Sequence, residues 1–118
     1  MSPRKWEARL GDIEKALAKI ERYIEGLSEA QFSADEKTID AVACNLEIVG
    51  EASHRLDAAI KAMIPKVKWL NLYDGRNNIG HEYFRRDLAL IWKTITVDVP
   101  EIRAEIQLFL ADAGTEGK

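Results

Sequence analysis

Apolar residues recur every three or four positions along the first part of the chain. This spacing continues over three heptads and is typical of one face of an α-helix. We therefore predict a helix from about residue 4 to residue 28. The residues of this stripe are Trp6, Leu10, Ile13, Leu17, Ile20, Ile24 and Leu27.

A second predicted helix follows a polar start signal. The segment Ser33-Ala34-Asp35-Glu36 has the spacing of a capping box, in which a hydroxyl and a carboxylate each accept a hydrogen bond from a free backbone N–H. We expect Pro65 to end this helix, because proline lacks an N–H and disfavours helical geometry in the residue before it. The expected core face is Ile39, Val42, Leu46, Val49, Ser53, Leu56, Ile60 and Met63.

The second helix carries another stripe, made of small and apolar residues, about 90° around the helix from the first. A helix with two such faces has two neighbours to contact. The second neighbour is either another helix of the same chain or a second subunit. The residues of this stripe are Ala41, Asn45, Ile48, Ala52 and Ala59.

Two further helices are predicted. The third runs from Val67 to about Tyr83, and Asp87 is placed to cap the fourth. Pro100 must kink or restart the fourth helix, and Asp98 with Glu101 would cap a restart. The third helix carries Trp69, Leu72, Arg76, Ile79 and Tyr83 on one side, and the fourth has apolar positions at Leu88, Ile91, Ile95, Val99, Ile102, Ile106 and Phe109.

These elements predict an all-α fold, an up-down bundle of four main helices with a kinked or restarted C-terminal helix. With 118 residues the chain suits one domain, which we place at residues 1–112, followed by a polar tail at 113–118. Long coiled-coil seams are the alternative for two of the stripes. Pro65, Pro100 and the short links disfavour it.

Composition narrows the class of protein. The uncharged stretches fall far short of the roughly 20 apolar residues that span a membrane, and no apolar segment follows the charged N-terminus, so we expect neither a membrane helix nor a signal peptide. The single Cys44 fits a reducing cytoplasm. One cysteine and two histidines disfavour a zinc site, and we predict no metal or other cofactor.

The charge distribution separates one segment from the rest of the chain. The net charge of −3 disfavours a protein that holds nucleic acid mainly by bulk charge. Residues 66–93, however, contain six cations and three anions, so this segment is +3 and the remainder is −6. A local basic surface on an acidic body is the resulting expectation.

Within that segment, Arg76 occupies a position in an apolar stripe where a bundle would favour a hydrophobic residue. A buried guanidinium is costly unless it is paired or belongs to a site. His81 follows five residues later, and an imidazole with a pKa near 6.5 suits proton transfer at neutral pH. Arginine with histidine and no metal ligands suits phosphodiester chemistry, because one group stabilises charge on phosphorus and the other moves a proton.

Residues five apart on one regular helix point about 140° away from each other. Arg76 and His81 converge only if the helix bends near Gly80 or if two subunits share the site. The structural alternatives are that Arg76 pairs with Glu51 or Asp40, and that His81 caps the end of the third helix.

The pattern Arg-Asn-x3-His-x-Tyr at residues 76–83 and the segment Asn-Leu-Glu-Ile-Val-Gly-Glu-Ala at 45–52, with Pro65, Trp69, Asp87 and Trp92, resemble the HepT-like family of the HEPN superfamily. The resemblance extends from the first helix to about residue 108. It implies the toxin of a toxin–antitoxin system, a metal-independent endoribonuclease that works as a cytoplasmic homodimer with both subunits lining one cleft.

The resemblance also implies residue roles. His81 would move the proton of the ribose 2′-hydroxyl or of the leaving 5′-oxygen, and Arg76 would bind the scissile phosphate of an RNA, with tRNA as one candidate. The products would be 2′,3′-cyclic phosphate and 5′-hydroxyl ends. Asn77 would orient either the imidazole or the phosphate, and Glu51 is a supporting candidate.

In such systems the antitoxin is a nucleotidyltransferase that adds AMP to the tyrosine of the motif, here Tyr83. The added negative charge and bulk beside His81 would block RNA. Spacing alone favours the alternative that Tyr83 is a core aromatic. Arg85 and Arg86 are placed either to contact RNA phosphates or to form a solvated turn. The alternative function is a non-catalytic module that binds a nucleotide or the nucleotidyltransferase partner.

Overall fold

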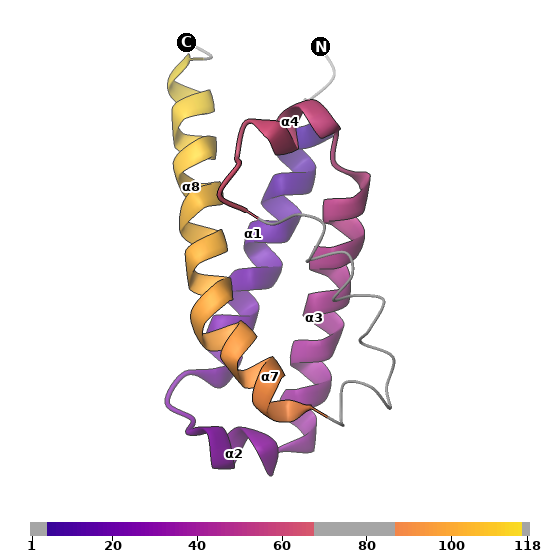
Figure 1. Cartoon of the computed structure of the whole chain (residues 1–118), viewed down its shortest axis with the longest axis vertical. Coiled ribbons are helices and arrows are strands. Elements are labelled where there is room, and N and C mark those ends of the chain that lie inside the picture. The colour runs from indigo at the N-terminus through magenta and orange to yellow at the C-terminus, as the bar shows by residue number, and fades with distance from the viewer. Residues whose placement is uncertain (1–4, 68–86, 117–118) are drawn as a thin grey trace.

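The structure is a computed structural model that describes residues 5–67 and 87–116, with side chains described up to residue 112. Three long helices stand side by side in it (Figure 1). They are α1 (Lys5–Ile24), α3 (Glu36–Arg55) and α8 (Val99–Glu116). Short elements join them: α2 (Glu29–Ser33), α4 (Ala58–Ala62), α7 (Leu88–Lys93) and the π-helical turn η1 (Thr94–Asp98). The predicted all-α bundle is confirmed for these residues.

The core lies where the predicted stripes of the three long helices meet. Leu17 of α1, Val42 of α3 and Ile106 of α8 are each fully buried. Aromatic pairs close the two ends of the core: the rings of Trp6 and Phe109 lie 5.5 Å apart, and those of Phe32 and Trp92 lie 5.3 Å apart. Trp92 is half-buried and packs against this core.

The first helix is shorter than predicted, because it ends at Ile24 rather than near residue 28. Gly26 adopts a φ of 80°, in the left-handed region where side chains are disfavoured, and this glycine stops the helix. The chain then turns into α2. Ser28 and Gln31 form the capping box of that helix, with each side chain bonded to the other's backbone N–H.

The capping box predicted at Ser33 is wrong, since Ser33 is the last residue of α2. Asp35 caps α3 instead. Its carboxylate accepts hydrogen bonds from the backbone N–H of Thr38 at 3.2 Å and from the hydroxyl of Thr38 at 2.7 Å. These bonds favour the ionised form and lower the pKa of Asp35 below its ordinary value of 3.8.

The second predicted helix is divided in two, because α3 ends at Arg55, well before Pro65. At Leu56 the backbone is extended, with ψ of 138°, and the leucine side chain is buried in the core. The chain therefore turns inward at Leu56 instead of continuing along the solvent. Met63, which the pattern placed in the core, is 61% exposed.

The C-terminal helix is joined from pieces, as predicted, but the joint differs from the one expected. Asp87 caps α7 by accepting a backbone hydrogen bond at 3.0 Å. In η1 the N–H of Val99 bonds to Thr94, five residues back. This wider turn accommodates the missing N–H of Pro100 without ending the helix. The backbone at Val99 stays helical, so the expected restart capped by Asp98 is wrong. The helix continues to Glu116, beyond the predicted domain boundary at residue 112.

Candidate functional site

Of the residues predicted to form the site, Glu51 lies within the described part of the chain. The others belong to residues 68–86, outside the described residues. On either side of that range the chain is well anchored. Val67 is buried, and Asp87 caps α7, which packs near α2. The site residues outside the described part are Arg76, Asn77, His81, Tyr83, Arg85 and Arg86.

Glu51 is half-buried on α3. Its carboxylate binds the guanidinium of Arg55, one turn further along, at 3.2 Å. His54, the other histidine of the chain, is exposed on the same helix. Cys44 is also exposed on this helix.

A groove of about 760 Å³ runs along the outside of the bundle, between α1 and α3. Its α1 wall carries three cations and one anion, and its α3 wall carries two anions and one cation. Small and apolar side chains lie between the walls. The residues lining it are Arg9, Asp12, Lys15, Ala16 and Lys19 of α1, and Cys44, Asn45, Glu47, Ile48, Glu51, Ala52 and Arg55 of α3.

The groove lies over the small stripe predicted on the second helix. Asn45 is buried, and its side-chain amide donates a hydrogen bond to the carbonyl of Ala41 at 2.9 Å. Ile48 remains 43% exposed, and Ala52 is half-buried. Ala59 lies apart from this stripe, exposed in α4. The first neighbour of the stripe is therefore α1, and the second neighbour stays a prediction.

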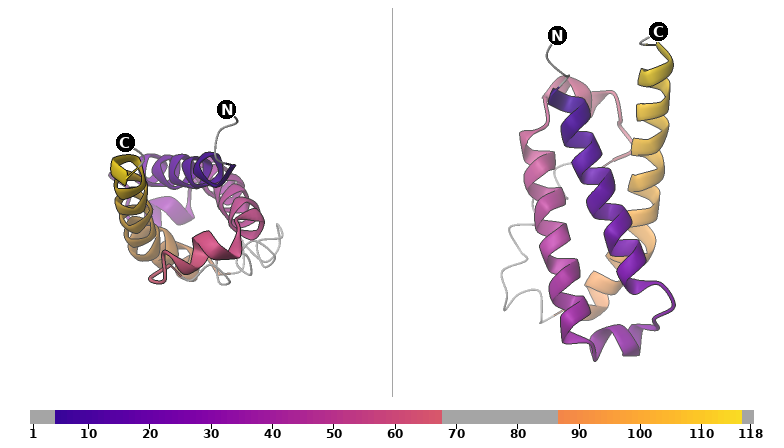
Figure 2. Two further views of the ribbon diagram at one scale, coloured as in Figure 1. Left: turned by 90° about the horizontal axis from the view of Figure 1, so that it is seen from above. Right: turned by 180° about the vertical axis from the view of Figure 1, so that it is seen from behind.

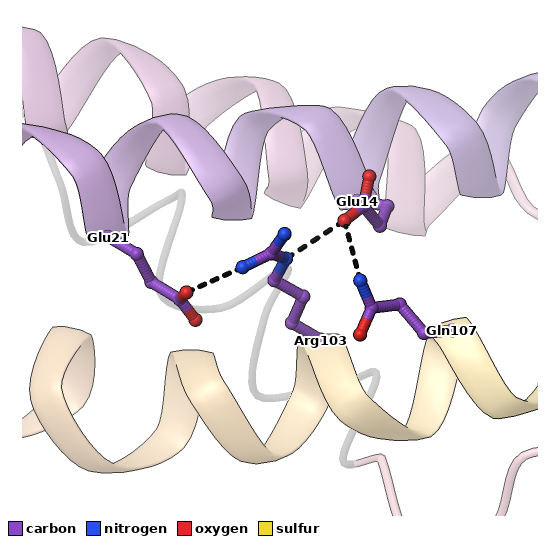
Figure 3. Close-up of polar contacts among 4 residues, drawn as sticks. All are labelled: Glu14, Glu21, Arg103 and Gln107. Atoms are coloured by element: carbon purple, nitrogen blue, oxygen red, sulfur yellow. Dashed lines mark hydrogen bonds and ion pairs between the residues drawn. The ribbon is translucent and has the colours of Figure 1, made fainter.

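The other flank of α1 holds a polar network that sequence reasoning missed (Figure 3). Arg103 of α8 donates to Glu14 at 2.8 Å and to Glu21 at 2.7 Å, and Gln107 donates to Glu14 at 3.2 Å. The bonds to Glu14 and Glu21 raise the pKa of Arg103 above its ordinary value. The signal available in the sequence was the seven-residue spacing of the two glutamates, which places both on one helix face.

Within residues 5–67 and 87–116, no group of three or more His, Cys, Asp or Glu side chains is placed to hold a metal ion. No helix in that part of the chain is long and apolar enough to cross a membrane.

Comparison with known proteins identifies the family. The family described as "Ribonuclease HepT-like" matches residues 13–109. "Probable ribonuclease HepT" of Thermococcus cleftensis is 33% identical over 98 residues, covering 83% of this chain and 89% of that protein. A relative from Methanocaldococcus jannaschii, whose name marks it as a candidate RNase, is 32% identical over 108 residues, covering 92% of this chain and 99% of that protein.

No solved structure is a significant match to this chain. The family match nevertheless spans all the predicted site residues, from Glu51 through the Arg76–His81 pair to Arg86, and it includes most of the three long helices. Together with the two relatives, it shows that the chain belongs to the HepT-like ribonuclease family.

Proposed function

We propose that this protein is a metal-independent endoribonuclease and the toxin of a toxin–antitoxin system. The observation that carries the proposal is the family match across residues 13–109, because that range contains Arg76 and His81 in the spacing that the sequence singled out for phosphodiester chemistry. The relatives named as ribonucleases support RNA as the substrate.

The chemistry follows from the two side chains. His81 takes the proton of a ribose 2′-hydroxyl, whose oxygen attacks the adjacent phosphorus, while the bond to the 5′-oxygen breaks. The leaving 5′-oxygen takes a proton from water or from a protonated imidazole, so the products are a 2′,3′-cyclic phosphate and a 5′-hydroxyl. Arg76 stabilises the extra negative charge on phosphorus. Asn77 and Glu51 support this pair, Arg85 and Arg86 bind neighbouring phosphates, and DNA is not cut because it lacks the 2′-hydroxyl.

Two partners belong to the proposal. A second copy of the chain completes the cleft, since Arg76 and His81 point apart on one regular helix. A nucleotidyltransferase antitoxin adds AMP to Tyr83. This modification places a negatively charged phosphodiester beside His81 and excludes the RNA phosphate by repulsion and bulk.

The test is cleavage of a tRNA pool in EDTA by the wild type, His81→Ala and His54→Ala, with the product ends mapped. His54 provides a matched control, since it is the other histidine of the chain and is exposed on α3. We expect cyclic-phosphate ends from the wild type and from His54→Ala, and a loss of about 100-fold or more in His81→Ala, the usual contribution of a general acid or base. Equal cleavage by all three proteins, or none by the wild type, would refute the proposal.

A further inference from the structure

The C-terminal helix carries a second apolar stripe, on the side opposite the core. Val97, at the end of η1, is followed by Ala104 and Leu108 of α8 at steps of seven and four, which places the three on one helix face. Val97 is 46% exposed, Leu108 is 61% exposed, and Ala104 between them is also exposed. The buried Val99 and Ile106 lie about half a turn away, so the core does not use this stripe.

The stripe faces away from the described part of the bundle. Seen from above, α8 forms one edge of the bundle, and none of the described elements lies beyond it (Figure 2). On one flank, Arg103 and Gln107 bind α1. On the other flank, Lys66 pairs with Glu105 at 3.8 Å. Neighbouring large apolar residues that are exposed on one face between two held flanks are typical of a contact surface.

The stripe has one acidic edge and one uncharged edge. Acidic residues repeat every seven positions along the first edge, and one more lies within the stripe. Lys66 pairs with one of these four carboxylates, so the face has a net charge of −3. The second edge, at Pro100 and Gln107, is uncharged. The acidic residues are Asp98, Glu105 and Asp112 along the edge, and Glu101 within the stripe.

This charge selects the class of partner. An acidic face repels the phosphates of RNA and the headgroups of an anionic membrane. A second copy of the chain is also disfavoured. Pairing about an axis parallel to α8 sets the Glu101 side chains of the two copies against each other, and pairing about an axis across α8 brings the two acidic edges together. A helix with a row of apolar residues beside a row of cations is complementary to the face.

We infer that the outer face of α8 is a docking surface for a partner protein, which binds through an amphipathic helix with lysine or arginine along one edge. Val97 and Leu108 pack between the apolar residues of that helix, and its cations lie over Asp98 and Asp112. The inference goes beyond the proposed function and does not depend on it, because it uses neither Arg76 nor any other residue of the predicted site.

The experiment measures binding of two helical peptides to the full chain by fluorescence anisotropy. Both peptides have the same leucine stripe, and one carries lysine at the edge positions where the other carries glutamate. We expect the lysine peptide to bind the wild type, and the glutamate peptide to bind at least about 10-fold more weakly. Leu108→Asp should weaken binding of the lysine peptide by about 30-fold or more, as expected for a central contact residue.

Met63→Asp is the matched control. Met63 is 61% exposed, as Leu108 is, but it lies at the end of α4 and not on α8. This variant should bind the lysine peptide as tightly as the wild type does. Because both side chains are largely in water, both variants should keep the melting temperature of the wild type to within a few degrees.

Reversal of the acidic edge tests the charge separately from the apolar stripe. The double variant Asp98→Lys/Asp112→Lys should lose the preference for the lysine peptide, because two of the carboxylates that attract its cations become cations. An unchanged preference in the double variant would contradict a partner with a cationic edge.

The results that overturn the inference are distinct from one another. A wild type that does not bind the lysine peptide, or binding that Leu108→Asp leaves unchanged, shows that the face is no docking surface for such a helix. A large fall in melting temperature in Leu108→Asp shows that the chain itself covers the face. Loss of tRNA binding in Leu108→Asp but not in Met63→Asp assigns the face to RNA, and a halved mass in solution assigns it to a second copy. The cleavage of tRNA in EDTA is measured independently and tests the proposed function alone.

Discussion

Both flanks of α1 carry charged residues, and they use them differently. On the flank toward α8, Arg103 reaches across and binds Glu14 and Glu21, so the charges join two helices of one chain. On the flank toward α3, the charged residues line a groove, and the ion pair between Arg55 and Glu51 lies within α3 itself. One flank is bridged by side chains of its own chain, and the other carries an open groove.

One pair of isoleucines shows a similar contrast in burial. Ile106, on the α8 side, is fully buried, whereas Ile48, on the α3 side, is 43% exposed. The comparison shows that charge content does not tell whether a helix flank is internal or external. The deciding feature is whether a long side chain from a neighbouring helix reaches the charges and satisfies them, as Arg103 does.

The largest expected difference between the flanks is in apolar packing. Ile106→Ala should lower the free energy of unfolding by about 2–5 kcal/mol, because it leaves a cavity among fully buried side chains. Ile48→Ala should lower it by less than about 1 kcal/mol in the monomer, because much of that side chain is already in water. Urea denaturation at low protein concentration measures both changes. Equal losses would show that the groove is part of the closed core.

A smaller difference is expected for the two arginines. Arg103→Ala should cost about 1–2 kcal/mol, because it removes two charge-assisted hydrogen bonds at sites where the three side chains are 22–30% exposed. Arg55→Ala should change stability by at most about 0.5 kcal/mol, since an exposed pair one turn apart on a helix contributes little.

The measurement for this pair is urea denaturation at low and high salt. The cost of Arg103→Ala should decrease as salt rises, because ions screen the attraction between the guanidinium and the two glutamates. Arg103→Lys is the control that keeps the charge and loses the fork of donors needed to bind both carboxylates. If Arg103→Ala were as mild as Arg55→Ala, the network would not hold α8 on α1.

Local patterns predicted the long helices and their buried faces, since the spacing of apolar residues such as Leu17 and Ile106 reflects the helix period directly. They did not predict the division of the second helix at Leu56, where burial of one side chain outweighs continuation of the helix, or the π-helical turn that accommodates Pro100. The network around Arg103 joins residues more than 80 positions apart. Patterns within one helix cannot predict which residues of another helix will bind them. For the site, the sequence identified Arg76 and His81 as candidate residues and predicted a second contact face on α3. It did not predict the net charge on the two sides of the groove, because that charge depends on which helix lies beside α3.

The smallest expected effect concerns Asp35, which caps the start of α3. The acidic wall of the groove lies further along the same helix. The hydrogen bonds from Thr38 lower the pKa of Asp35 in the folded protein below 3.8, so the ionised carboxylate stabilises the fold above that pH. This contribution is lost as the pH falls through the pKa of the folded state. Asp35→Asn keeps a capping oxygen and removes the titration. Melting temperatures of both proteins should differ by a constant amount above about pH 5 and converge as the pH falls toward about 2. A constant difference down to the lowest pH would show that the cap stabilises α3 by geometry alone.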